Sequence, residues 1–167
     1  MIAKSYILSN LHALNRSYGT APTPKEAQFF SKLAILELCG WIEESMDDAI
    51  LTCARKHLRE PVNRNYCEKQ IVKRTFGFDY HKHFRFMLIR LLGLIAVEKI
   101  ERKTDAAIQA KMISALSTLK QQRDSEAHTH LKGVTRTINA PSVTIGQFQP
   151  VYGGLLEIDR MVRLARF

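Results

Sequence analysis

The feature of the sequence that most constrains its fold is an uninterrupted stretch between Pro24 and Leu58. It contains no further proline and a single glycine, Gly40. Thr23 is a favourable N-cap residue, Pro24 suits the first turn of a helix, and Glu26 completes a capping box. Since nothing after this start interrupts an α-helix, we predict one long helix of roughly 30 residues, straight or bent near Gly40. Its apolar face is formed by Leu38, Ile42, Met46, Ala49 and Cys53.

The rest of the chain also favours helices, because apolar residues recur at intervals of three and four. We predict a helix over Lys4–Arg16, a short one from Pro61 to about Arg74, an apolar one over Phe84–Leu92 that Gly93 interrupts, a core helix capped by Thr104 or Asp105, and a last helix from Pro150 or slightly earlier to Arg166. A break is expected at Asn139–Ser142, and the one strand-like alternation is Val134–Ile138. The sum is an all-α, up-and-down bundle of four to five main helices. We expect a single domain over residues 1–167, with its core at roughly 24–166 and an N-terminal helix and loop at 1–22.

The charge of the chain is high and unevenly placed. The net charge is +9, and residues 54–103 hold thirteen basic and five acidic side chains. Residues 33–54 hold five acidic side chains and no lysine or arginine. A basic half of this kind is typical of proteins that bind a partner such as RNA, DNA or an acidic protein. The candidates for an RNA-binding surface, with Tyr66 among them, are Arg64, Lys69, Lys73 and Arg74; the alternative is ordinary solvated surface.

No pattern in the sequence indicates a metal, a cofactor or a membrane. The three cysteines have no metal-ligand spacing, so we expect reduced thiols. His81 and His83, like His128 and His130, are two residues apart and would point to different sides of a helix. Residues 1–18 lack the pattern of a secretory signal, and the longest apolar run, 88–97, is half the length of a membrane span. We therefore expect a cytoplasmic protein without metal or cofactor.

The candidate catalytic residues lie where the core helix runs into the polar sequence RDSEAH, residues 123–128. Arg123 is a permanent cation with a planar fork that suits phosphate oxygens. His128, five positions later, has a side chain that titrates near neutrality and can transfer protons. Arg123 to His130 fits a similar spacing. So does Arg74 to His81, but that pair encloses TFGFDY, whose three aromatic residues indicate packing in a turn.

Together these residues resemble the Arg-x4-6-His signature of the HEPN superfamily of helical ribonucleases, in which a polar residue such as Asp124 follows the arginine. The segments Glu37–Ile50 and Lys132–Phe148 are similar to the RiboL-PSP branch of that superfamily. The resemblance implies a metal-independent endoribonuclease that uses the 2′-hydroxyl of RNA as nucleophile and leaves 2′,3′-cyclic phosphate ends. It further implies a homodimer with a composite active site. The setting it implies is a toxin or an antiviral, restriction-associated effector, with an antitoxin or defence-system protein as partner.

One histidine cannot easily act as base and acid on opposite sides of one phosphate, which is why two copies of the motif are expected across a dimer groove. Asp124 and Glu126 are candidates to hold the arginine or histidine, Ser125 and Thr129 to donate hydrogen bonds to phosphate, and His130 to be a second proton carrier or a substrate contact. On the long helix, an acidic stripe of Glu37, Trp41, Glu44 and Asp48 is expected to supply an orienting carboxylate, with Glu44 and Asp48 as candidates. That stripe is alternatively a solvated face, or a partner of the basic half. Gly40, costly inside a helix, indicates a close helix–helix contact.

Two other functions fit the same sequence. One is a non-catalytic HEPN-type module that binds RNA or a partner protein. The other is a helical adaptor whose acidic helix docks another protein. The intact set of Arg123, Asp124 and His128 favours the enzyme, because a binding module is free to lose it.

Overall fold

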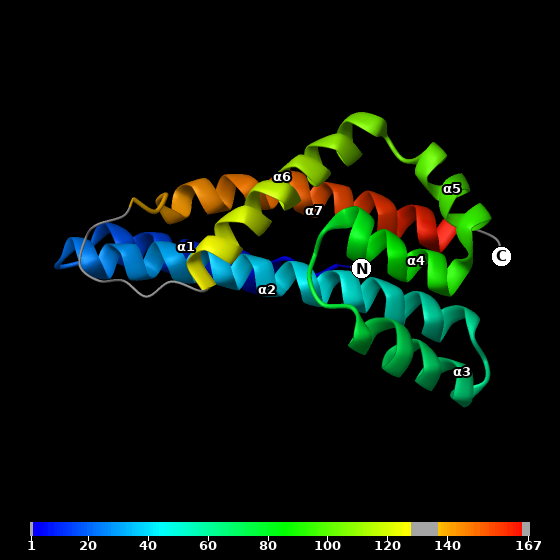
Figure 1. Cartoon of the computed structure of the whole chain (residues 1–167). Helices are drawn as coiled ribbons and strands as arrows, with labels where there is room; N and C mark the ends of the chain where they lie inside the picture. Colours follow the sequence, from blue (N-terminus) through cyan, green and yellow to red (C-terminus); the bar gives the residue numbers. More distant parts are fainter. Residues whose placement is uncertain (1, 128–136, 165–167) are drawn as a thin grey trace.

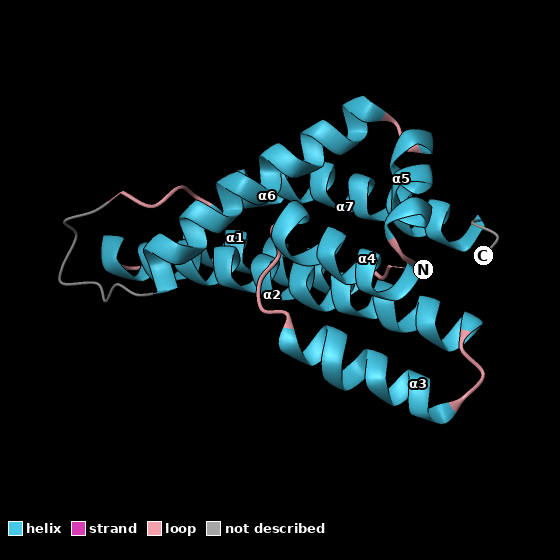
Figure 2. Cartoon of the chain, turned by 45° about the vertical axis from the view of Figure 1, so that its right-hand side comes forward, coloured by secondary structure: helices cyan, strands magenta, loops and turns pink. Residues whose placement is uncertain are grey.

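Every element in the described part of the chain is helical. The computed structural model describes residues 2–127 and 137–164, and no strand occurs among them (Figures 1 and 2). The elements are α1 (Ser5–Gly19), α2 (Pro24–His57), α3 (Pro61–Tyr66), η1 (Cys67–Ile71), η2 (Val72–Arg74), η3 (Tyr80–Phe84), α4 (Arg85–Leu92), α5 (Leu94–Lys103), α6 (Ala106–Ala127) and α7 (Pro141–Leu164). The all-α prediction is therefore confirmed for these residues.

Four long helices form the bundle, and each runs opposite to the one before it. Helices α1 and α2 lie side by side, and α6 crosses α2 and α7 obliquely (Figure 1). The shorter helices α3, α4 and α5 are inserted between α2 and α6 and lie toward the C-terminal end of α2 (Figures 1 and 2). Because these helices occupy that end of the bundle, the C-terminal end of α6, which carries Arg123, contacts the middle of α2.

The start of α2 follows the chemistry of its first four residues. The Thr23 hydroxyl accepts a hydrogen bond from the Glu26 backbone N–H at 3.2 Å and donates to the Glu26 carboxylate at 3.1 Å. Pro24 occupies the first turn, where its missing N–H is not needed. The predicted start is confirmed, and the helix then continues for 34 residues to His57.

The segment from Pro61 to Arg74 is helical, as predicted, but it is not a regular α-helix. It begins as α3, widens to a π-helical turn at η1 and tightens to a 3₁₀ turn at η2. Ile71 and Val72, where the winding changes, are both buried.

Gly93 divides the apolar run 88–97 between α4 and α5. Its φ of +84° is one that side-chain-bearing residues rarely adopt, and it turns the chain sharply between the two helices. Helix α6 then begins after Asp105, whose carboxylate accepts hydrogen bonds from the N–H groups of Ala107 and Ile108. Among the described residues, no helix is long and apolar enough to cross a membrane.

The last helix is longer than predicted and begins at Pro141 rather than near Pro150. Pro150 lies inside the helix, where a proline costs about 3 kcal/mol. That cost is offset by a stripe of buried residues that continues on both sides of it, from Thr144 and Phe148 to Val151 and Leu155. The predicted break is therefore confined to the residues before Pro141. Of the strand-like segment 134–138, only Thr137 and Ile138 are described, and they are not in a strand.

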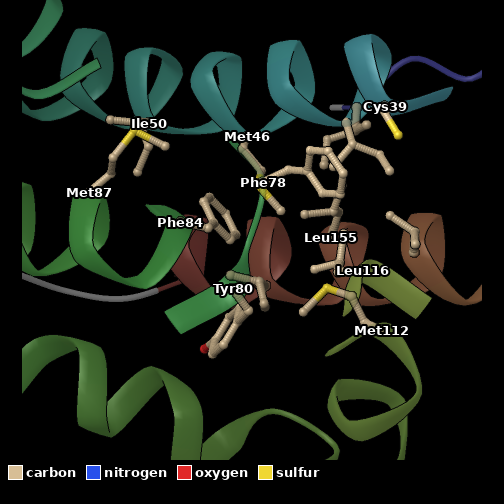
Figure 3. Packing of buried hydrophobic residues seen from close by; sticks show 14 of the residues in the cluster. Cys39, Met46, Ile50, Phe78, Tyr80, Phe84, Met87, Met112, Leu116 and Leu155 are labelled. Atoms are coloured by element: carbon tan, nitrogen blue, oxygen red, sulfur yellow. The ribbon is translucent and has the colours of Figure 1, made fainter. Parts of the chain in front are cut away.

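One hydrophobic cluster joins the elements, and its members come from every long helix. Phe78, Phe84 and Met87 lie beneath α2, with Leu155 of α7 and Met112 of α6 beyond them (Figure 3). Ile2, Ile7 and Leu11 belong to the same cluster, so the N-terminal helix is part of the core rather than an addition to it. All three cysteines are buried and free of disulfides.

Candidate active site

Arg123 lies one turn before the end of α6 and is held by three contacts. Its Nη1 donates to the Glu43 carboxylate of α2 at 2.8 Å. Its Nε and Nη2 donate to one oxygen of Asp124 at 3.2 and 3.0 Å. Its guanidinium carbon lies 5.2 Å from the ring centroid of Phe78, in cation–π geometry. A long, flexible cation is thereby fixed in one orientation.

The guanidinium remains accessible although it is held. Its side chain is 31% exposed and that of Glu43 37% exposed. A guanidinium carries five N–H donors, and these contacts use three of them. Within the described residues, one donor therefore remains on each terminal nitrogen. Two parallel N–H groups on adjacent nitrogens are the arrangement that binds two oxygens of a phosphate.

Asp124 joins Arg123 to a second cation. Lys120, one turn earlier on α6, donates to the other oxygen of the Asp124 carboxylate. The hydrogen bonds from Lys120 and Arg123 lower the pKa of Asp124 below its ordinary value, so the group is ionised at neutral pH. The cluster of Lys120, Arg123, Asp124 and Glu43 carries two positive and two negative charges, so it presents no net charge to a ligand.

Ser125 and Glu126 line a pocket rather than the surface beside Arg123. The pocket has a volume of about 260 Å³, and its lining also includes Ile35 and Ile138. Glu126 is 5% exposed. The predicted supporting residues therefore divide into Asp124, which contacts Arg123, and two that line this pocket.

Three predicted residues lie outside the described part of the chain. They are His128, the proposed proton carrier, and Thr129 and His130. The last described residue of α6 is Ala127, so the structure carries the helix to the residue directly before His128.

The orienting acid on α2 is Glu43, next to the predicted Glu44. The side chain of Glu44 is exposed, and Asp48 pairs with Arg55 at 3.3 Å. The first two residues of the predicted stripe contact the N-terminal segment instead. Glu37 accepts a hydrogen bond from Asn10 of α1, and the Trp41 N–H donates to the backbone oxygen of Ala3, which precedes α1. Trp41 also packs against Phe148 and Tyr152 of α7, so it serves the core.

A signal for Glu43 was present in the sequence. Residues four apart share a helix face, so Cys39, Glu43 and Asp47 form a row on α2. Cys39 is buried beneath Arg123, and burial raises the pKa of its thiol to about 12 despite the nearby guanidinium. This row singles out the helix face that carries Glu43, but not the helix that packs against it.

Asp47 is the second acid that sequence reasoning missed. Burial, and then the charges of Glu43 and Glu44, raise its pKa to about 6. A carboxyl with this pKa is partly protonated near neutral pH, unlike ordinary aspartates. Its charge therefore changes in the range where a histidine also titrates.

Gly40 does not mark a helix–helix contact within the described residues. A Cβ placed there meets no atom within 4 Å, and the position is exposed. Phe29 and Leu33, both exposed, lie on the same side of α2, because residues separated by three, four, seven or eleven positions share a helix face. The glycine and these two apolar side chains together are called the α2 open face.

The competing pair, Arg74 and His81, brackets a turn that reaches the site. Phe78 and Tyr80 of this turn are buried, which confirms the packing predicted for them, whereas Phe76 is exposed. Phe78 is the ring beneath Arg123. His81 packs edge-on against Tyr80 with ring centroids 5.1 Å apart, and Arg74 is exposed on η2.

The candidate RNA-binding residues are exposed on α3, η1 and η2. Two of them have partners within the chain. Arg64 donates to the backbone oxygen of Leu58 at 2.7 Å, and Lys73 pairs with Glu68 at 2.6 Å. An exposed ion pair such as Lys73–Glu68 is weak, so a phosphate can displace it.

Among the described residues, no group of three or more histidine, cysteine, aspartate or glutamate side chains is arranged to hold a metal ion. His83 has a different role, because its Nδ1 accepts a hydrogen bond from the Asp79 backbone N–H at 2.9 Å. Comparison of the chain with protein-family models, curated proteins and solved structures finds no match.

Proposed function

We propose that the protein is a metal-independent endoribonuclease of the HEPN type. The observation that carries the proposal is the state of Arg123. Two carboxylates and an aromatic ring hold it at the surface, and one N–H on each terminal nitrogen remains for a phosphate. His128 follows five residues later in the sequence.

In the proposed reaction the 2′-oxygen of a ribose attacks the adjacent phosphorus and the bond from phosphorus to the 5′-oxygen breaks. One His128 accepts the proton of the 2′-hydroxyl, and a second His128, from another copy of the chain, gives a proton to the departing 5′-oxygen. Arg123 stabilises the negative charge that gathers on the non-bridging oxygens. The products are a 2′,3′-cyclic phosphate and a 5′-hydroxyl. We propose an intracellular toxin or defence effector as the biological setting, with an antitoxin or defence-system protein as its partner.

The second copy is proposed to dock on the α2 open face. Gly40 has no neighbour within 4 Å, although a glycine inside an exposed helix costs about 1 kcal/mol relative to alanine. Phe29 and Leu33 extend the same face with apolar surface. Glu43 is also on α2, three residues after Gly40, so a helix that crosses at Gly40 brings two Arg123 sites near one groove.

The test is incubation of the purified protein with mixed RNA in excess EDTA, followed by analysis of the ends. We expect cleavage with cyclic phosphate ends. Arg123→Ala and His128→Ala should each lower the rate by a factor of about 100 or more, the contribution of one positioned group. Arg102→Ala is the matched control, because Arg102 is also a helical arginine, is 80% exposed and pairs with Glu98. Cleavage that needs a metal ion, or that survives His128→Ala, would contradict the mechanism.

One observation favours a second candidate, a non-catalytic module that binds RNA or a protein. Glu43 and Asp124 neutralise Arg123 and compete with any phosphate. If the wild-type protein binds RNA without cutting it, this candidate replaces the enzyme. Toxicity on expression that disappears in Arg123→Ala would favour the enzyme instead.

A further inference from the structure

Phe76 is an aromatic side chain that the fold leaves in solvent. It is 82% exposed, whereas Phe78, two residues later, is 1% exposed. Full burial of such a ring is worth roughly 1.5–3 kcal/mol, which this position forgoes. One exposed apolar residue is ordinary. Phe76 differs from such a residue in the contacts that fix its turn, in the candidate active site beside that turn, and in the basic residues that precede it.

The turn that carries Phe76 is fixed by contacts on both sides. Gly77 has a φ of +113°, and a Cβ there would lie 2.8 Å from the His83 ring, so only glycine fits. The same His83 ring accepts the hydrogen bond from the Asp79 backbone, and Asp79 in turn accepts one from the Lys82 N–H at 2.8 Å. Before Phe76, the Thr75 hydroxyl donates to the Ile71 backbone oxygen at 2.8 Å. The ring is therefore presented by a rigid turn.

The turn lies against the candidate active site. The ring centroid of Phe78 is 5.2 Å from the guanidinium carbon of Arg123. The Cα atoms of Phe76 and Phe78 cannot be more than about 7.6 Å apart, because successive Cα atoms are 3.8 Å apart. Phe76 therefore belongs to the turn that contacts the cation proposed to bind the cleaved phosphate.

The chain directly before Phe76 is basic. Lys73 and Arg74 are exposed on η2, three and two residues before the ring. A row of cations beside an exposed aromatic side chain is the combination that binds single-stranded nucleic acid, since the cations meet phosphates and the ring stacks on a base. A duplex cannot use such a ring, because its bases are already stacked on one another.

We propose that Phe76 is a stacking platform for one unpaired base of the RNA whose phosphate lies at Arg123, so that the substrate is single-stranded RNA. The inference rests on the proposed function for the identity of the phosphate site. It adds a positioning residue and the strandedness of the substrate. Binding at Phe76 does not require cleavage, so the two proposals fail separately.

The experiment measures binding of fluorescently labelled oligonucleotides to the His128→Ala protein, which is expected not to cut them. Phe76→Ala should weaken binding of a single-stranded RNA about ten-fold, the usual loss for one stacked base, and leave binding of a duplex unchanged. Phe76→Trp should restore binding, whereas Phe76→Leu, apolar but without an aromatic ring, should not. Tyr6→Ala is the matched control, because Tyr6 is an equally exposed aromatic residue on α1.

Three results would overturn the inference: equal binding by Phe76→Ala and the parent protein, an equal loss for single strands and duplexes, or no binding of RNA at all. Recovery of binding by Phe76→Leu to the level of Phe76→Trp would also overturn the inference. Any apolar side chain would then suffice, as at an interface with a protein partner. If the wild-type protein cuts no RNA but Phe76→Ala still weakens single-strand binding, the proposed function fails and the platform stands. Equal melting of the variants shows that the turn is intact.

Discussion

Among the described residues near the site, Asp47 has a raised pKa. Its pKa of about 6 arises because burial and the charges of Glu43 and Glu44 disfavour the carboxylate. In the unfolded chain the pKa returns to about 3.8. Between these two values the folded state binds more protons than the unfolded state. The free energy of unfolding therefore falls as pH rises from about 4 to about 6, and changes no further above that range on account of this group.

Asp47→Asn should remove this dependence. We expect the variant to be more stable than wild type at pH 7, by roughly 1 kcal/mol after allowance for partial solvent exposure, and equal to it near pH 4. Urea unfolding at pH 4, 5, 6 and 7 measures the difference. Asp48→Asn is the control, because Asp48 is exposed on the same helix. If the free energies of unfolding of Asp47→Asn and wild type differ by the same amount at every pH, burial of Asp47 does not raise its pKa.

At the candidate site, the sequence was sufficient to find Arg123 and Asp124 but not their partner. Residue type and position along α6 identify the first two, because they follow an apolar repeat directly. Glu43 and Glu44 are equivalent in composition and differ only by 100° around α2. Which of them meets Arg123 depends on the crossing angle of two helices, and a pattern within one helix does not contain that angle.

The elements were predictable where a local cap or break defines them. Element boundaries lie as expected at Thr23, Asp105 and Gly93. Each of these residues acts through hydrogen bonds or backbone angles within a few residues. Pro150 misled the prediction for α7, because a proline usually starts a helix, and here the packing on both sides of it outweighs its cost. The π-helical turns at η1 and η3 were missed for a related reason: their extra residue per turn is invisible to a search for regular spacing.

Adjacent glycines on α7 offer a matched pair of substitutions. A Cβ at Gly154 would lie 2.4 Å from the Met112 Cβ on α6, whereas a Cβ at Gly153 meets nothing within 4 Å. Gly154→Ala should therefore destabilise the protein by about 1–3 kcal/mol through overpacking. Gly153→Ala should stabilise it by about 0.5–1 kcal/mol, because alanine is the better helix former. Thermal unfolding measures whether each variant is less or more stable than wild type. A Gly154→Ala variant more stable than wild type would mean that α6 and α7 are less closely packed than the Gly154–Met112 contact indicates.

For the whole molecule, the proposed dimer can be tested at Gly40 without disturbing the monomer. Since a Cβ at this position meets no described atom within 4 Å and the position is exposed, Gly40→Leu should fold and should be at least as stable as wild type. If the α2 open face joins two copies, the variant should sediment as a monomer and lose RNA cleavage. Gly146→Leu is the control, because Gly146 on α7 also has no neighbour within 4 Å.

The acids beside the α2 open face add a second expectation. Glu37 and Glu44 of two copies would repel each other across it, so association should strengthen as salt screens the repulsion. A wild-type protein that sediments as a monomer at every salt concentration, or a Gly40→Leu variant that remains dimeric, would exclude this face as the interface.

The uneven charge along α2 makes the molecule an electric dipole. The helix is about 50 Å long, with its acidic residues near the middle and the basic segments α3 to α5 toward its C-terminal end (Figure 1). Near a polyanion, such a dipole experiences a torque before it makes any contact, and the basic end turns toward the ligand. The collision is therefore already oriented: the basic segments at the C-terminal end of α2 arrive first, while the acidic middle of α2 trails and stays available to another partner.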